Sequence, residues 1–152
     1  VGGNYAASLG AGERAHALGY SAVLYLDPKE KKYLDECGPA NFYAIKDGKY
    51  ITPASDSILP SITNESLMQL ARDFGMEVER RHITVDEIPD FEEAAAVTSP
   101  VGEIHDLDNN VKYVISKDGK PGPVTTRFYE TLSAIRLGEI EDKHGWNMVL
   151  DL

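Results

Sequence analysis

Residues 41–52 read NFYAIKDGKYIT, two β-rich runs that flank Lys46-Asp47-Gly48. An Asp-Gly pair between such runs is typical of a β-hairpin, because a type I′ turn needs a positive φ at both central positions. We therefore predict a hairpin with strands over residues 41–45 and 49–52.

Two segments that follow the hairpin carry helix signals. Apolar residues recur at three- and four-residue spacing over residues 64–74, which predicts an amphipathic helix that Thr63 or Asn64 can cap. A final helix is predicted to run from Pro123 to about Leu137, because Pro favours the first helical position and Gly138 favours the stop.

The remaining elements alternate between helix and strand. Residues 22–26 form a nearly continuous apolar run, which predicts a short strand buried on both faces. Thr84-Val85-Asp86-Glu87 is a capping box that predicts a short helix. The other predicted elements are a helix over 4–18 and strands over 77–83, 94–98, 101–104 and 112–115. This mixture predicts an α/β (mixed α+β) fold with a mixed sheet.

Composition limits the class of protein. A chain of 152 residues suits a single domain over residues 1–152, and its net charge of −10 argues against general nucleic-acid binding. No apolar run is long enough to span a bilayer, and Cys37 is the sole cysteine. We therefore expect a soluble, cytoplasmic protein.

Three features could carry chemistry. Ser61-Ile62-Thr63 precedes a helix, where free N–H groups favour an anion, although an ordinary helix cap explains the same residues. Glu36 could pair with a cationic ring nitrogen, as pyridoxal phosphate requires, or be a solvated loop glutamate. Gly2-Gly3-Asn4-Tyr5 would allow close backbone approach to a ligand. The four histidines lack metal-ligand spacing, so no metal site is expected.

Several motifs together resemble the branched-chain-amino-acid aminotransferases, which belong to the fold-type IV pyridoxal-phosphate enzymes. The resemblance follows the family's order along nearly the whole chain. The matching segments are residues 1–9, 33–36 with 41–42, 51–53, 58–64, 138–139 and 142 with 145–146. The resemblance implies the large C-terminal, cofactor-binding domain of that fold, a mixed sheet or pseudo-barrel flanked by helices, without the small N-terminal domain.

The resemblance also implies how individual residues contact the cofactor. It places Tyr5 beside pyridoxal 5′-phosphate, Glu36 on the protonated pyridinium nitrogen, Leu59 on one ring face, and Ile62 and Thr63 on the phosphate. Asn41 is expected to orient Glu36.

The implied reaction is transamination, in which leucine, isoleucine or valine gives its amino group to the cofactor and 2-oxoglutarate collects it. A homodimer is implied as well. The family's Schiff-base lysine would come directly before Val1, and no lysine of this sequence matches it. The 152-residue chain alone is therefore not expected to transaminate.

One segment departs from the family pattern. The family carries a Gly-Thr-Ala turn between an alanine-rich strand and a Ser-Pro segment, whereas here Ala96 runs directly into Val97. The alternatives are another fold-type IV enzyme, D-amino-acid aminotransferase or aminodeoxychorismate lyase, and a non-catalytic folding or dimerisation module. The Gly-Gly-Asn-Tyr and Gly-Trp motifs fit the other fold-type IV enzymes less well.

Overall fold

The predicted hairpin lies at the centre of the fold in the computed structural model, which describes residues 8–148 and 150. Strands β3 (Ala40–Lys46) and β4 (Lys49–Pro53) pair antiparallel, with Lys46 opposite Lys49. Asp47 and Gly48 both have positive φ, 52° and 69°. The hairpin prediction is therefore confirmed.

The other elements pack around this hairpin. In chain order they are α1 (Leu9–Ala17), β1 (Leu24–Leu26), β2 (Leu34–Cys37), β3, β4, α2 (Ile62–Asp73), β5 (Val78–Arg81), a 3₁₀ helix (Val85–Asp90), β6 (Glu93–Ala96), β7 (Ser99–Pro100), β8 (Glu103–Asp106), β9 (Val111–Val114) and α3 (Pro123–Leu137). None of the helices in this part of the chain is long and apolar enough to cross a membrane.

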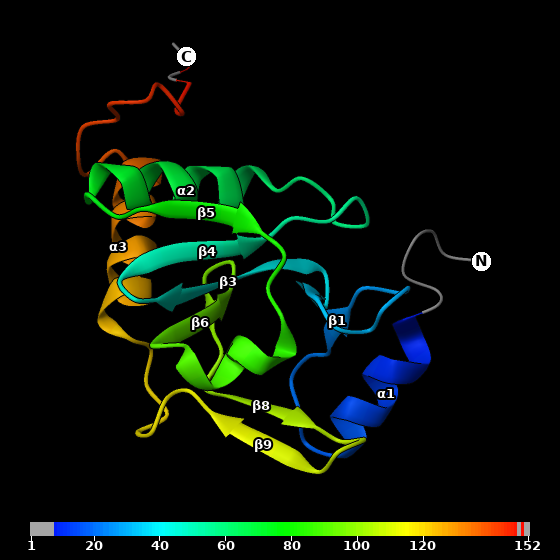
Figure 1. The fold of residues 1–152 in the computed structure, drawn as a ribbon. Helices are drawn as coiled ribbons and strands as arrows, with labels where there is room; N and C mark the ends of the chain where they lie inside the picture. The colour runs from blue at the N-terminus through cyan, green and yellow to red at the C-terminus, as the bar shows by residue number, and fades with distance from the viewer. Residues whose placement is uncertain (1–7, 149, 151–152) are drawn as a thin grey trace.

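The main sheet has seven strands and mixed direction. Its order is β1-β2-β3-β4-β5, and β6 pairs with both β3 and β7. Only β4 and β5 run parallel among the described strand pairs, and β8 and β9 form a separate hairpin. Figure 1 shows α2 and α3 together at one end of the molecule, and α1 and the β8–β9 hairpin at the other. The predicted mixed α/β fold is confirmed.

The alternation of β3 side chains divides the core into two clusters. Tyr43 and Ile45 belong to a cluster with apolar residues of α2 and α3. Phe42 and Ala44 belong to a second cluster, which includes Ile88 of the 3₁₀ helix. Successive side chains of a strand point to opposite faces, so both faces of β3 are covered.

Two predicted elements need correction, and the start of a third is not tested. The run over 22–26 is not a strand buried on both faces, because β1 has β2 as its only strand partner among the described residues and Leu26 is exposed. The α2 cap is not Thr63 or Asn64, because the Ser61 side chain accepts from Asn64 N–H and the helix begins two residues earlier than predicted. Helix α1 begins at Leu9, and residues 4–7 of the predicted helix lie outside the described residues.

The start of α3 is fixed by a carboxylate from β6. Gly122 precedes the helix and has no side chain to cap it, and Pro123 takes the first helical position as predicted. The two Glu93 oxygens instead accept from the N–H groups of Val124 and Thr125, at 2.9 and 2.7 Å. Glu93 is buried, so this contact satisfies both the carboxylate and the helix start.

Gly122→Ala should weaken the fold, because a Cβ at this position would overlap the Glu93 carboxyl group. We expect a loss of about 1–3 kcal/mol in the free energy of unfolding, as in other overpacked sites, measured by urea denaturation. Gly12→Ala in α1 is the matched control, because its Cβ would meet nothing within 4 Å. Equal stability of the two variants would contradict the assignment.

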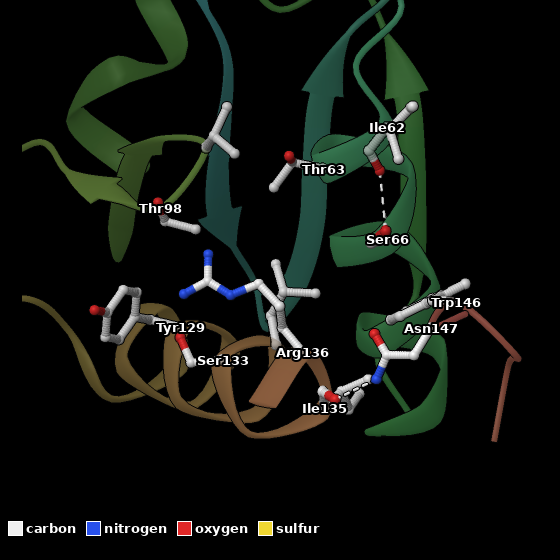
Figure 2. A pocket seen from close by; sticks show the side chains of 12 residues that line it. Ile62, Thr63, Ser66, Thr98, Tyr129, Ser133, Ile135, Arg136, Trp146 and Asn147 are labelled. Atoms are coloured by element: carbon white, nitrogen blue, oxygen red, sulfur yellow. Dashed lines mark hydrogen bonds between the residues drawn. The ribbon is translucent and has the colours of Figure 1, made fainter. Parts of the chain in front are cut away.

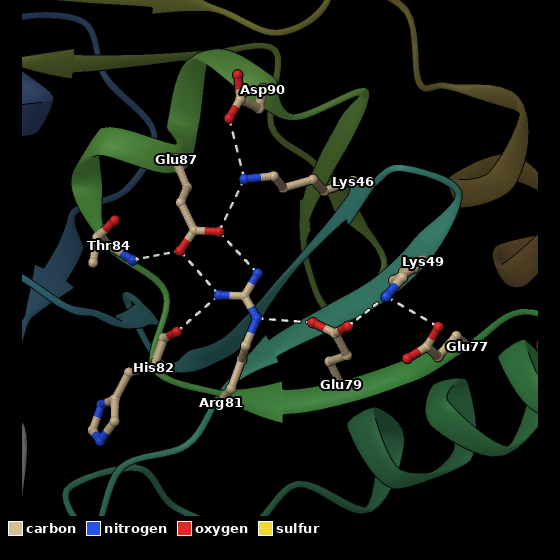
Figure 3. A network of polar contacts seen from close by, with 9 residues as sticks. All are labelled: Lys46, Lys49, Glu77, Glu79, Arg81, His82, Thr84, Glu87 and Asp90. Carbon is tan, nitrogen blue, oxygen red and sulfur yellow. Dashed lines mark hydrogen bonds and ion pairs between the residues drawn. The ribbon is translucent and has the colours of Figure 1, made fainter.

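Ion pairs cover the junction between β5 and the 3₁₀ helix (Figure 3). Arg81 binds both oxygens of Glu87, at 2.9 and 2.8 Å, and its Nε donates to Glu79 at 2.8 Å. Lys46 Nζ lies 3.0 Å from Glu87. Glu87 also closes the capping box with Thr84, which confirms the predicted start of this helix. The network joins β3, β5 and the helix through one carboxylate.

Glu87→Gln should change the acid stability of the protein. The Arg81 guanidinium lowers the pKa of Glu87 from 4.5 to about 2, so the stabilisation is present above pH 4.5 and is lost as the pH falls toward 2. We expect the free energy of unfolding of the variant to be about 1 kcal/mol lower at pH 7, a modest loss because water screens partly exposed ion pairs. Between pH 4.5 and 2, this free energy should fall less steeply in the variant than in the wild type. Urea unfolding across this range tests it, with exposed Glu13→Gln as control; parallel pH profiles would refute it.

Candidate functional site

Glu36 lies in a strand of the main sheet. It belongs to β2 and stands opposite Asn41 of β3 in the antiparallel pair. Its side chain is part-buried, so the interpretation as a solvated loop glutamate is wrong. The short Gly38-Pro39 connection between the two strands explains why residues five positions apart face one another.

Three hydrogen bonds join Glu36, Asn41 and Leu59. Asn41 Nδ2 donates to Glu36 Oε1 at 3.1 Å and to the Leu59 carbonyl at 3.0 Å. The Leu59 N–H donates to the same Glu36 oxygen at 3.1 Å. Among the described residues, Glu36 Oε2 has no hydrogen-bond partner. The Oε1 oxygen is therefore held in place, while Oε2 can accept a hydrogen bond from a further donor.

A second contact fixes the loop that carries Leu59. Ser57 Oγ donates to Asp35 Oδ2 at 2.7 Å. Asp35 is buried, and its Oδ1 atom has no partner among the described residues. Neighbouring carboxylates of β2 thus hold the loop between β4 and α2 at two points, Ser57 and Leu59.

The first turn of α2 is attached to the central hairpin through Asn64, whose side chain is only 3% exposed. Tyr50 Oη donates to Asn64 Oδ1 at 2.6 Å, and Asn64 Nδ2 donates to Thr52 Oγ1 at 3.2 Å. Burial raises the pKa of Tyr50 well above its ordinary value, so its hydroxyl stays a donor at neutral pH. The start of the helix is therefore fixed by neutral, paired groups.

Ile62 and Thr63 occupy the first two positions of α2. Their N–H groups have no acceptor inside the helix, as in any first helical turn, and Ile62 is 87% exposed. Thr63 lines a hollow between α2 and α3, whose wall also includes Val97 and Thr98 (Figure 2). Leu59, just before the helix, is 56% exposed. The exposed start of α2 can therefore accept an anionic group.

Strands β6 and β7 are joined by a turn of two residues. Ala96 pairs with Ser99, and Val97 and Thr98 form the turn between β6 and β7. Val97 has a φ of 56°, which is unfavourable for a β-branched residue, and its N–H donates to the Asn41 carbonyl at 2.9 Å. Asn41 therefore contacts this turn through its backbone and Glu36 through its side chain.

Some predicted site residues are placed by the structure and others are not. Glu36, Asn41 and Leu59 meet at one point, and Thr63 follows four residues after Leu59 at the start of α2. Tyr5 and the glycines at 2 and 3 lie outside the described residues. No group of three potential metal ligands occurs within the described part of the chain.

Sequence patterns did not reveal the supporting contacts of Asp35, Tyr50 and Asn64. A polar Asn at the first turn of an apolar helix was the available signal, but the same residue equally indicates a helix cap. Its partners Tyr50 and Thr52 come from a strand more than ten residues away, which a local pattern does not report.

Comparison with known proteins identifies relatives of this chain. The chain is 41% identical over 160 residues to a probable branched-chain-amino-acid aminotransferase of Staphylococcus epidermidis, covering 97% of this chain and 44% of that protein. It is 44% identical over 158 residues to a branched-chain-amino-acid aminotransferase of Haemophilus influenzae, covering 96% and 46%. The chain thus spans less than half the length of these relatives.

Solved structures show the same fold. The branched-chain amino acid aminotransferase of Escherichia coli superposes with a TM-score of 0.80 at 30% identity, over 95% of this chain and 47% of that one. The branched-chain amino acid aminotransferase of Thermobaculum terrenum, in its PLP-form, gives a TM-score of 0.68 at 30% identity, over 82% and 40%.

A family model agrees with both kinds of likeness. The model for class IV amino-transferases matches residues 1–104, more than half of the chain. The predicted resemblance to the branched-chain aminotransferases is confirmed, and the chain belongs to the class IV aminotransferase family.

Proposed function

We propose that this chain forms the cofactor-binding part of a branched-chain-amino-acid aminotransferase that uses pyridoxal 5′-phosphate. The observation that carries the proposal is the Glu36 carboxylate, fixed by Asn41 and Leu59 in a chain 41–44% identical to proteins of that name. This chain spans less than half the length of those relatives. The aminotransferase activity is therefore assigned to a protein of their length that contains this chain.

The donor set fits pyridoxal phosphate at both of its ends. Glu36 has one oxygen free to accept from a protonated ring nitrogen, and the other oxygen is already held in place by described residues. The N–H groups of Ile62 and Thr63, which have no acceptor within the helix, suit a phosphate at the start of α2. When bound, the cofactor supplies an electron sink for the bond broken at the substrate Cα.

The chain's own residues have separate tasks in this proposal. Glu36 keeps a proton on the ring nitrogen, and Asn41 sets the direction of its carboxylate. Leu59 covers one face of the ring, and Tyr5 lies beside it. By family resemblance the reactive lysine is assigned to the position before Val1. We further propose a cytoplasmic homodimer, with leucine, isoleucine or valine as amino donors and 2-oxoglutarate as acceptor.

An assay with several substrates separates the proposal from its alternatives. The protein encoded by the complete gene, supplied with pyridoxal phosphate, should form glutamate from 2-oxoglutarate with leucine, isoleucine and valine. Activity with D-alanine alone would indicate a D-amino-acid aminotransferase, and release of 4-aminobenzoate from aminodeoxychorismate would indicate the lyase. A protein that leaves the absorbance of pyridoxal phosphate unchanged would be a non-catalytic module.

Glu36→Gln should abolish most of this activity, because a neutral amide does not stabilise a protonated ring nitrogen. We expect kcat with leucine to fall by about two orders of magnitude, the scale of a lost acid–base contribution. Glu30→Gln is the matched control, since Glu30 is exposed in the turn before β2. Unchanged turnover in Glu36→Gln would exclude the assigned role.

Asn41→Ala should release both Glu36 and the loop at Leu59. We expect kcat to fall about tenfold, the cost of losing roughly one well-placed hydrogen bond. Hydrogen exchange at the Leu59 amide should accelerate, while the Tyr50 amide, bonded to the Glu77 carbonyl at 2.9 Å, stays protected. Faster exchange at both amides would show general unfolding and would count against a local positioning role.

A further inference from the structure

The buried carboxylate of Asp35 has no task in the function proposed above. Asp35 lies on β2, directly before Glu36, and is only 6% exposed. Carboxylates are almost never buried to this extent without partners, because taking the charge out of water is costly. The one hydrogen-bond partner of Asp35 among the described residues is Ser57, with 2.7 Å between Ser57 Oγ and Asp35 Oδ2. A buried acid with a single partner calls for an explanation.

The bond between Ser57 and Asp35 ends a chain of hydrogen bonds that has a definite direction. The hydroxyl oxygens of Ser55 and Ser57 lie 2.7 Å apart. The Ser57 hydroxyl has a single hydrogen, which it donates to Asp35, so Ser55 is the donor in the serine pair. The chain therefore runs from Ser55 through Ser57 to the carboxylate. Successive donors polarise one another, and an ionised acceptor gives the chain its strongest end.

This chain joins the middle of the loop between β4 and α2 to the rest of the protein. The two ends of the loop are fixed separately, because the Ala54 N–H is bound to the last residue of β5 at 3.0 Å and Leu59 is held by Glu36. For residues 55–58, the bond from Ser57 to β2 is the one described hydrogen bond to another segment. Figure 1 shows this loop extending beyond the end of β4 before the chain returns to α2. The four residues that precede Leu59 thus depend on one carboxylate for their polar attachment.

We propose that Asp35 is a positioning residue for the cofactor ring, which acts through Ser57 on Leu59. Asp35 and Glu36 are neighbours, but they control different properties of the site. Glu36 acts on the ring nitrogen and so affects turnover. Asp35 fixes the loop that brings Leu59 over the face of the ring, and so affects how tightly the ring is bound. The inference rests on the proposed function for the identity of the ligand, but the state of the loop is measurable without any ligand.

The loop is tested first, by hydrogen exchange in the complete protein without cofactor. Ser57→Ala, a change at an exposed side chain, should accelerate exchange in peptides covering residues 54–60 about tenfold, while the Tyr50 amide in β4 stays protected. Asp35→Ala should have the same effect, and Asp35→Asn, which keeps an oxygen acceptor, should restore part of the protection. Because both alanine variants remove the same bond, the double variant should exchange no faster than either single variant. Additive effects, or wild-type exchange in Ser57→Ala, would overturn the proposal.

Cofactor affinity and turnover then separate Asp35 from Glu36. In the complete protein, Ser57→Ala and Asp35→Ala should each raise the Kd of pyridoxal phosphate about tenfold, the scale of one net hydrogen bond, in an absorbance titration. At saturating cofactor, kcat should stay close to the wild-type value. Asp56→Asn is the matched control, because it removes an exposed acid from the same loop and should change neither quantity.

Two outcomes of this second measurement count against separate claims. A lower kcat at unchanged cofactor affinity in Ser57→Ala would refute the positioning role of Asp35. Failure of the wild-type protein to bind pyridoxal phosphate would refute the proposed function, and the exchange measurement would still decide whether Asp35 fixes the loop.

Discussion

The buried Asn64 amide determines where the start of α2 lies. An unpaired amide in the core costs on the order of 1–3 kcal/mol, so Asn64 stays where Tyr50 and Thr52 satisfy it. Both partners belong to β4, and Thr52 Oγ1 donates in turn to the Phe42 carbonyl at 2.8 Å. The helix start is thereby attached to the central hairpin. These hydrogen bonds therefore also determine the position of any site that uses the exposed N–H groups of the first turn of α2.

The loop before α2 is held by carboxylates instead of neutral groups. Asp35 and Glu36 are consecutive on β2, and they bind Ser57 and Leu59 of that loop. The proposed ring partner is thus also a structural anchor, with one oxygen for each task.

Local signals predicted the elements whose ends depend on backbone conformation. Asp47-Gly48 indicated the hairpin and the Pro123 to Gly138 pair indicated the last helix, because φ preferences act without regard to tertiary context. The apolar run over 22–26 was misleading, since hydrophobicity does not tell an edge strand from a central one. The position of Glu36 in a strand, like the partners of Asn64, depends on contacts between distant segments. Family resemblance therefore nominates the residues of the candidate site, but the contacts that support them were not predictable from the sequence.

Val97, whose backbone conformation is unfavourable, is connected both to Glu36 and to the hollow at the start of α2. A β-branched residue at a φ of 56° persists only when its surroundings enforce it. Here the enforcement is the pairing of Ala96 with Ser99 together with the hydrogen bond from Val97 N–H to the Asn41 carbonyl. The Asn41 side chain meanwhile orients Glu36. A change in the β6–β7 turn would therefore affect the orientation of Glu36 through Asn41, which contacts both. It would also alter the hollow, because Val97 lines it. The two-residue turn between β6 and β7 is thus a constraint on both ends of the site at once.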